Sequence, residues 1–120
     1  MMDKAVILVV EDEALLRFNA VDMLTDAGYV VLDAANADEA LLILEERDDI
    51  SVVFTDVNMP GSMDGLELAE SIRRSWPPVS LVVTSGKNVL RDLDLPLGGR
   101  FVPKPYTKDQ VLSAVMQLSA

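Results

Sequence analysis

Hydrophobic and polar positions alternate along the chain in two rhythms. Short apolar runs rich in β-branched residues are separated by longer stretches in which apolar residues recur every three or four positions. The short runs are the expected strands, at residues 5–10, 29–34, 51–56, 79–84 and 100–102. The first run is apolar throughout, as a central strand covered on both sides should be. Strands that alternate with helices predict an α/β fold with a parallel sheet and helices on both faces.

The first helix is expected to begin at about Asp12 and to end at Gly28. Glycine commonly ends helices because it adopts the left-handed conformation without strain. The apolar residues of this stretch form two neighbouring rows at helical spacing, Ala14, Phe18 and Val21 in one and Leu16, Ala20, Met23 and Ala27 in the other. This is the pattern of an amphipathic helix.

Three later helices are marked by capping patterns, in which a polar residue is followed three positions on by Glu or Gln. The pairs are Asn36 with Glu39, Asp64 with Glu67, and Thr107 with Gln110. The first of these helices is expected to reach about Glu46, and the second to end before Trp76-Pro77-Pro78, because proline cannot continue a helix. The last helix carries its apolar residues on one stripe and beside it: Val111, Val115, Leu118, Leu112 and Met116.

A further stretch, Lys87 to Leu93, has a weaker helical pattern. Pro96 and Gly98-Gly99 interrupt it, so we expect about five helices, the fourth short or irregular. Five strands and five helices occupy residues 1–120 and leave no room for a linker, so one domain is expected.

Composition excludes several classes of function. The chain has 20 acidic and 10 basic residues and a formal net charge of -10, so its surface field should repel nucleic acid and anionic membranes. It has no cysteine, which excludes disulfides and thiolate metal sites. Neither a signal peptide nor a membrane span is recognisable. We therefore expect a soluble cytoplasmic protein without direct nucleic-acid or membrane partners.

Candidate chemistry gathers where the expected strands end. The residues there are, in chain order, Glu11, Asp12, Asp56, Ser85 and Lys104. The carboxyl ends of parallel strands meet at one edge of the sheet, where such folds bind their ligands. Three carboxylates, a hydroxyl and an ammonium are therefore expected to converge.

These groups suit phosphoryl chemistry. Neighbouring carboxylates repel one another unless a proton or a cation relieves the repulsion. With neither His nor Cys in the chain, the ligands are oxygen atoms, and a few carboxylates with room for water and phosphate oxygens suit Mg²⁺. An aspartate such as Asp56 can attack phosphorus and form an acyl phosphate when cations screen the charge. Lys104 is the candidate for part of that screening.

Each residue also has an ordinary structural explanation. Glu11 and Asp12 are the acids usual in the first turn of a helix, and Asp56 precedes Asn and Pro as turn-forming aspartates do. Lys104 can be a solvated loop lysine, and Ser85 can satisfy the local backbone. The coincidence of complementary groups at successive strand ends is what favours a site.

Four segments carry a resemblance to a known family. They are Val9-Val10-Glu11-Asp12, Asp56-Val57-Asn58-Met59-Pro60 with Asp64-Gly65, Val83-Thr84-Ser85-Gly86, and Lys104-Pro105-Tyr106. In this order they resemble the receiver domain of bacterial two-component response regulators, over the whole chain. The resemblance implies a flavodoxin-like, doubly wound five-stranded sheet of order 2-1-3-4-5, organised as in the single-domain chemotaxis regulators.

The resemblance also implies roles at the site. Asp56 would accept a phosphoryl group from the phosphohistidine of a sensor histidine kinase or a phosphotransfer protein. Asp12, Asp56 and the backbone carbonyl of Asn58 would ligate Mg²⁺, with Glu11 acting directly or through water. Lys104 would help to neutralise the phosphoryl charge. The expected chemistry is limited to this self-catalysed transfer and to dephosphorylation, so the chain is not expected to be an enzyme.

A conformational switch is implied as well. Ser85 corresponds to the switch hydroxyl, because Gly86 follows it where the family has Ala or Gly, and Phe101 corresponds to the switch aromatic. The switched surface would contact an unknown downstream protein. A core aromatic that never moves is the alternative for Phe101. The peptide between Lys104 and Pro105 is expected to be cis, which only proline readily permits.

Three departures from the family pattern bear on this interpretation. Glu11 stands where the family more often has Asp. Residues 61–63 make the loop after the third strand one residue longer than in the chemotaxis regulator. Pro96 and Gly98-Gly99 lie in the place of a regular fourth helix, so the usual dimer surface is not assumed.

Other functions stay open. A phosphate sink and a pseudo-receiver adaptor fit the same residues, and the chain is either a single-domain regulator or a piece of a longer protein. A haloacid-dehalogenase-like phosphatase needs an acid two residues after its nucleophile, where this chain has Asn58, and it carries that nucleophile on the first strand. A flavin-binding flavodoxin needs a hydroxyl- and glycine-rich phosphate loop where this chain has Glu11-Asp12-Glu13.

Overall fold

The computed structural model describes residues 5–86, 95 and 98–119. Strands and helices follow one another as the sequence predicts. The strands are β1 Val6–Val10, β2 Val30–Ala34, β3 Ile50–Asp56, β4 Ser80–Ser85 and β5 Arg100–Pro103. The helices are α1 Ala14–Asp26, α2 Ala37–Glu46, α3 Gly65–Ser75 and α4 Lys108–Ser119. The expected short helix at Lys87 to Leu93 lies outside the described residues.

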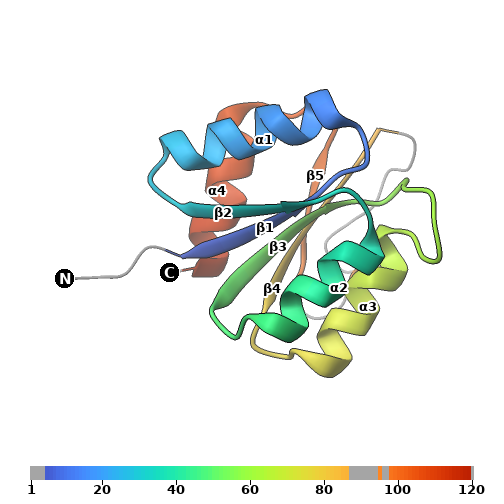
Figure 1. The fold of residues 1–120 in the computed structure, drawn as a ribbon. Coiled ribbons are helices and arrows are strands. Elements are labelled where there is room, and N and C mark those ends of the chain that lie inside the picture. Colours follow the sequence, from blue (N-terminus) through green and yellow to red (C-terminus); the bar gives the residue numbers. More distant parts are fainter. Residues whose placement is uncertain (1–4, 87–94, 96–97, 120) are drawn as a thin grey trace.

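The five strands form one parallel sheet of order β2-β1-β3-β4-β5 (Figure 1). The register aligns the carboxyl ends of the central strands. Val10 of β1 lies opposite Thr55 of β3, Asp56 lies opposite Thr84 of β4, and Ser85 lies opposite Pro103 of β5. The predicted doubly wound, flavodoxin-like topology is confirmed, and it brings the candidate residues to one edge.

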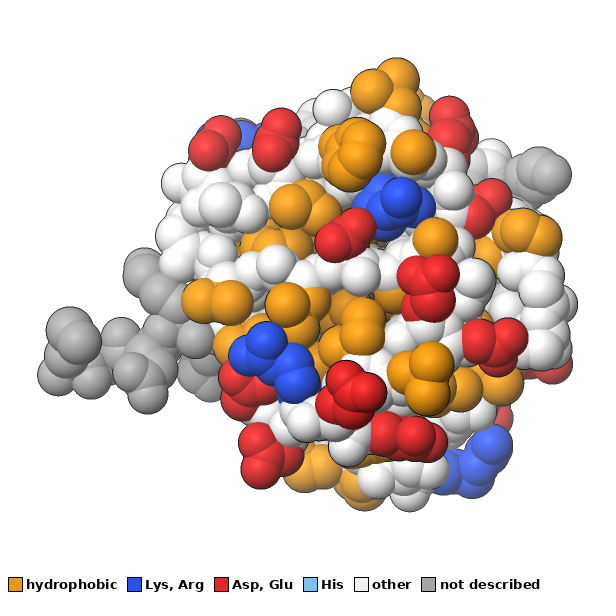
Figure 2. All heavy atoms as spheres, in the orientation of Figure 1, with side chains coloured by type: hydrophobic (Ala, Val, Ile, Leu, Met, Phe, Trp, Pro, Cys, Tyr) orange, Lys and Arg blue, Asp and Glu red, His pale blue; other side chains and the backbone are white. Residues whose placement is uncertain are grey.

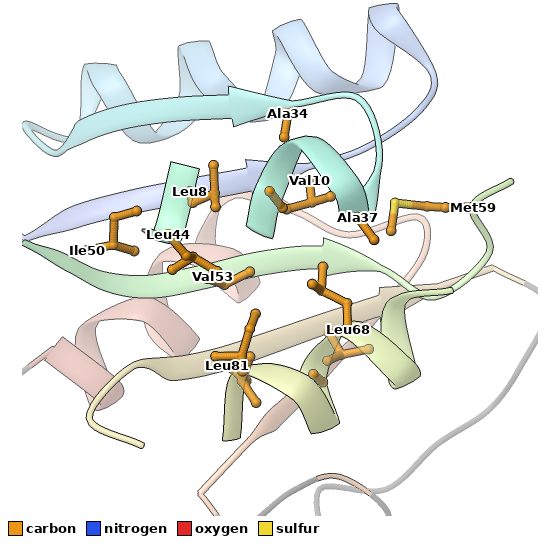
Figure 3. Packing of buried hydrophobic residues seen from close by; sticks show 14 of the residues in the cluster. Leu8, Val10, Ala34, Ala37, Leu44, Ile50, Val53, Met59, Leu68 and Leu81 are labelled. Carbon is orange, nitrogen blue, oxygen red and sulfur yellow. The ribbon is translucent and has the colours of Figure 1, made fainter. Parts of the chain in front are cut away.

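Helices cover both faces of the sheet, α1 and α4 on one side and α2 and α3 on the other (Figure 1). Successive residues of β1 point to opposite faces, so Leu8 packs on the α2/α3 side and Ile7 on the α1/α4 side. Figure 3 shows the α2/α3 side of this core, with Leu8, Val53 and Leu68 among its labelled residues. Burial on both faces explains why β1 and β3 are apolar almost throughout.

Helix α1 uses its apolar rows only in part. Ala20 and Leu24 are buried against the sheet, whereas Leu15 and Phe18 are 66% and 58% exposed. A narrow stripe of α1 therefore makes the contact with the sheet, and Phe18 from the first row lies outside it. Gly28 has φ 98° directly after the helix, as predicted for a helix-ending glycine.

Two of the three capping pairs are reciprocal. Asp64 accepts a hydrogen bond from the backbone N–H of Glu67, whose carboxylate accepts one from the N–H of Asp64. Thr107 and Gln110 make the same exchange. Before α2, the Asn36 side chain caps the helix, but the partner carboxylate of Glu39 accepts from the N–H of Ala35 instead.

Acidic side chains are spread over the face of the molecule seen in Figure 2, with basic side chains in fewer places. This distribution fits the net charge of -10. In the described part of the chain, no helix has the length and apolar character needed to cross a membrane.

Candidate functional site

The end of β3 delivers Asp56 into a tightly packed turn. The Asp56 side chain is buried, with the residue only 6% exposed. The N–H of Val57 donates to the carbonyl of Thr84, and the N–H of Gly65 donates to the carbonyl of Val57. A Cβ atom added at Gly65 would overlap the carbonyl oxygen of Asp56, so glycine is what lets α3 begin this close to β3. The backbone around Asp56 is thus fixed by hydrogen bonds to β4 and α3 and by the close approach of Gly65.

Glu11 and Asp12 do more than start a helix. Helix α1 begins at Ala14 after Glu13, whose side chain makes no capping hydrogen bond. Glu11 is buried at 5% exposure and its carboxylate accepts from the N–H of Glu13, whereas Asp12 is exposed. Carboxylate oxygens of Glu11, Asp12 and Asp56 lie within 4.8 Å of one another. We call these three side chains the acid pocket.

Lys104 lies against the acid pocket and is not a solvated loop lysine. Its Nζ donates to Oε1 of Glu11 and to Oδ2 of Asp56, each at 3.1 Å. Its backbone N–H donates to the carbonyl of Ser85, which ties the end of β5 to β4. The following peptide, to Pro105, is cis as predicted. One ammonium group therefore bridges two of the three carboxylates.

Burial and charge shift the acid–base properties of these groups. Burial raises the pKa of Glu11, and the hydrogen bonds from Glu13 and Lys104 oppose this only in part, while the Asp56 charge adds to it. For Lys104, burial acts to lower the pKa, but the hydrogen bonds to Glu11 and Asp56 outweigh it and raise the pKa overall. The pocket thus favours the charged form of Lys104 and disfavours the charged form of Glu11.

The acid pocket fits a hard divalent cation. Its donors are all carboxylate oxygens, which suit Mg²⁺ rather than a softer metal. Asp12 is exposed, so the pocket is open on one side. Among the described residues, one ammonium against three carboxylates also leaves an excess of negative charge, which a divalent ion would neutralise. The expected ligand at the Asn58 carbonyl stays a prediction.

Ser85 faces the site from the end of β4. It is buried, and its Oγ accepts a hydrogen bond from Nδ2 of Asn58 at 3.0 Å. The neighbouring Thr84 alternates to the other side of the strand, where its hydroxyl is buried beside Val9 and Phe54. Ser85 is thus hydrogen-bonded to the turn that follows Asp56, and its switch role stays a prediction.

Two aromatic residues stand on either side of Lys104 in the sequence. Phe101 is half-buried and packs against the α2/α3 side of the core. Tyr106 lies on the other face, its ring edge-to-face with Phe54 at 5.5 Å between centroids, and burial raises the pKa of its hydroxyl. The switch role of Phe101 stays a prediction.

The loop after β3 is hydrogen-bonded to helix α2. The hydroxyl of Ser62 donates to Oδ1 of Asp38, in the first turn of α2, at 2.7 Å. Gly61 has φ 112°, a conformation that favours glycine, and allows the chain to turn there. The Ser62 hydroxyl thus connects this loop to the first turn of α2.

Sequence reasoning did not find two side chains that shape the site. The Asn58 amide reaches Ser85, although only the backbone carbonyl of Asn58 was expected to matter. Arg17 of α1 donates to the backbone carbonyl of Glu11. One sequence signal was available for Arg17, because it is the only basic residue of α1.

Comparisons with known proteins agree with this geometry. A family model described as the response regulator receiver domain matches residues 7–116. The sensor kinase CckA of Brucella abortus (strain 2308) is 35% identical in an alignment of 118 residues that covers 95% of this chain and 12% of that protein. A putative NtrX-like response regulator of Rickettsia bellii (strain RML369-C) is 31% identical over 110 residues, 88% of this chain and 23% of that protein. The chain therefore spans only a small part of either relative.

Solved structures give the same result. A response regulator receiver protein from Sinorhizobium medicae WSM419 superposes with a TM-score of 0.88 at 29% identity, over 98% of this chain and 96% of that one. The receiver domain of the hybrid histidine kinase CckA gives a TM-score of 0.83 at 34% identity, over 97% and 100% of the two chains. The chemotaxis protein CheY4 of Vibrio cholerae shares the fold, with a TM-score of 0.84 at 24% identity over 97% and 99%.

Proposed function

Because the chain belongs to the response regulator receiver domain family, we propose that Asp56 is the residue that accepts a phosphoryl group. The observation that carries the proposal is the arrangement around this carboxylate. Asp56 is buried at the end of β3, bonded to Lys104 and grouped with Glu11 and Asp12 within 4.8 Å. A nucleophilic carboxylate beside cationic screening is what acyl phosphate formation requires.

In the proposed transfer, a carboxylate oxygen of Asp56 attacks the phosphorus of a phosphohistidine on the donor. A new O–P bond forms as the P–N bond breaks, and the electron pair of that bond stays on the imidazole nitrogen, which takes up a proton. The product is an aspartyl phosphate with close to two negative charges. Lys104, 3.1 Å from Oδ2 of Asp56, is placed to neutralise part of that charge.

The acid pocket is proposed to hold Mg²⁺ through Glu11, Asp12 and Asp56. When bound, the ion supplies further positive charge at the phosphoryl oxygens, which makes attack by an anionic carboxylate possible. The chain's own part is to keep three carboxylates together in a site that is open on the Asp12 side, with Lys104 offsetting their repulsion until the ion binds.

Ser85 is proposed to report the phosphorylation. Its hydroxyl, now accepting from the Asn58 amide at 3.0 Å, would turn to donate a hydrogen bond to a phosphoryl oxygen. That turn would move the end of β4 and let Phe101 of β5 change position, altering the surface that a downstream protein contacts. A histidine kinase or phosphotransfer protein is the proposed donor, and cytoplasmic location stays a prediction.

The proposal is tested by mass spectrometry of the intact protein after incubation with acetyl phosphate. The wild type should gain the mass of one phosphoryl group in the presence of Mg²⁺ and far less after chelation by EDTA. Asp56→Asn should abolish the gain, because an amide is a poor nucleophile. The matched control is Asp22→Asn, which removes the same charge from an exposed position of α1 and should label normally. Stable labelling of Asp56→Asn at the wild-type level would refute the assignment.

A further inference from the structure

Arg17 is the fourth residue of α1 and contacts the backbone of Glu11, one of the residues of the acid pocket. Its guanidinium group makes two hydrogen bonds, from Nη1 to the backbone carbonyl of Glu11 at 2.8 Å and from Nε to Oδ2 of Asp33 at 3.1 Å. The side chain is largely buried, at 16% exposure, whereas that of Asp33 is 46% exposed. One planar group thus joins α1, the end of β1 and the edge strand β2.

The segment that Arg17 holds is the one that carries two of the pocket carboxylates. Glu11 donates its N–H to the carbonyl of Ala34 at the end of β2, and Glu13 accepts at its carbonyl from the N–H of Arg17. Because the guanidinium group also donates to the Glu11 carbonyl, the backbone is hydrogen-bonded on both sides of Asp12.

Asp12 depends on this backbone. It is exposed, and among the described residues its carboxylate makes no hydrogen bond of its own. Glu11, by contrast, is held at its side chain by Lys104 and by the N–H of Glu13. The direction in which Asp12 points is therefore decided by the conformation of residues 11–13, the segment whose carbonyl Arg17 grips.

We propose that Arg17 is a positioning residue for divalent-cation binding, acting through the Glu11 carbonyl to aim the Asp12 carboxylate into the acid pocket. Asp33 supports this role, because its ion pair with Arg17 orients the guanidinium group toward the Glu11 carbonyl. The inference rests on the proposed Mg²⁺ site and adds to it a support outside the ligands. Groups that orient metal ligands in this way commonly change metal affinity by about 10–100-fold when removed.

A purely electrostatic role would give a different outcome. A positive charge near three carboxylates relieves their repulsion and competes with a cation, so on charge alone the loss of Arg17 should strengthen Mg²⁺ binding. The positioning role requires the opposite sign. Arg17→Lys also distinguishes the electrostatic role from the positioning role, because lysine keeps the charge but cannot present two N–H groups in the fixed geometry of guanidinium.

The experiment measures the dissociation constant for Mg²⁺ by isothermal titration calorimetry on the whole chain. Arg17→Met and Arg17→Lys should both bind about tenfold more weakly than the wild type. The matched control is Arg47→Met, which removes an arginine that pairs with Asp49 on the exposed surface at 2.6 Å and should bind within about twofold of the wild type. Amide resonances of Asp12 and Glu13 should shift in the Arg17 variants and not in the control.

A double-mutant cycle separates positioning from general destabilisation. If Arg17 acts through Asp12, then Asp12→Asn should cost clearly less Mg²⁺ affinity in the Arg17→Met protein than in the wild type. Additive effects, or wild-type affinity in a folded Arg17→Met or Arg17→Lys variant, would overturn the inference. If Arg17→Met does not fold, the Mg²⁺ affinity of Arg17→Lys, alone and combined with Asp12→Asn, tests the inference in the same way. A wild type that binds no Mg²⁺ would instead overturn the proposed metal site, and this inference with it.

Discussion

The middle and the carboxyl end of the central strands are both buried, but the first is apolar and the second is polar. In the middle, residues such as Leu8 and Val53 are fully buried aliphatic side chains between two layers of helices. Three positions after Val53, Asp56 is almost as deeply buried, at 6% exposure. All the buried polar residues of the described part lie at the carboxyl ends: Glu11, Thr55, Asp56, Thr84 and Ser85.

This difference separates what stabilises the domain from what it does. Burying an aliphatic side chain stabilises the fold by about 1.5–3 kcal/mol. Burying a carboxylate costs free energy unless it is paired and hydrogen-bonded. Lys104 compensates only part of that cost, since two buried carboxylates share one ammonium. A carboxyl end built for stability alone would continue the aliphatic pattern, so its polarity reflects function.

The largest contrast should come from one substitution in each region. Leu8→Ala should lower the free energy of unfolding by about 2–5 kcal/mol, because it leaves a cavity in the core, while the folded fraction still labels with acetyl phosphate. Asp56→Asn should do the reverse, losing the label with little loss of stability. Urea denaturation followed by the fluorescence of Trp76, the single tryptophan, measures the first quantity. Trp76 suits this use because it lies beside Ile50 and Val79, at the opposite end of the strands from the site.

A smaller effect is expected for Lys104, whose ammonium bridges the carboxylates of Glu11 and Asp56. Lys104→Met should lower the stability of the metal-free protein by about 1–3 kcal/mol, because two buried carboxylates lose their charged hydrogen bond. Saturating Mg²⁺ should remove most of this difference, since a cation replaces the missing charge. Lys108→Met, at an exposed position of α4, is the charge-matched control. A Lys104 deficit that is the same with and without Mg²⁺ would contradict the shared role.

The smallest effect should appear at Glu11, and it should depend on pH. Because the pKa of Glu11 is raised in the folded protein, the folded state holds more protons than the unfolded state between the ordinary and the raised value. Stability then increases as pH falls through this window and is lower above it. Glu11→Gln should therefore be slightly more stable than the metal-free wild type at neutral pH, while binding Mg²⁺ more weakly.

The two unfolding curves should converge as pH falls through the window, because protonated Glu11 and the glutamine side chain that replaces it in the variant are both neutral. The comparison is made by urea denaturation over a pH series in EDTA. A gap between the proteins that widens toward acid would show that folding lowers the pKa of Glu11 instead of raising it.

Much of the fold was accessible from sequence for local reasons. Strand periodicity, the helix-ending Gly28 and the Asp64–Glu67 capping box depend on neighbouring residues, and the structure confirms each. Which face of a helix is buried depends on long-range contacts and was predicted less accurately. The apolar row containing Phe18 was correctly predicted to be helical, but which part of α1 meets the sheet depends on how the helix lies across β1 and β2.

The candidate site divides in the same way. That acids, a hydroxyl and a lysine follow strand ends could be read from the chain, and parallel topology then required them to meet at one edge. The bridge from Lys104 to both Glu11 and Asp56 could not be read, because it joins residues 93 and 48 positions apart. The same holds for the Asn58 amide on Ser85, 27 positions away.

The sequence by itself determined the class of chemistry, because residue types at strand ends decide which groups are present and hydrophobic periodicity decides on which elements they stand. Only the tertiary structure decided which of these groups touch. Hydrogen bonds and ion pairs act over about 3 Å, and distances of that size between remote segments depend on strand register and on close approaches such as Gly65 against Asp56. The grip of Arg17 on the Glu11 carbonyl belongs to this second kind of information.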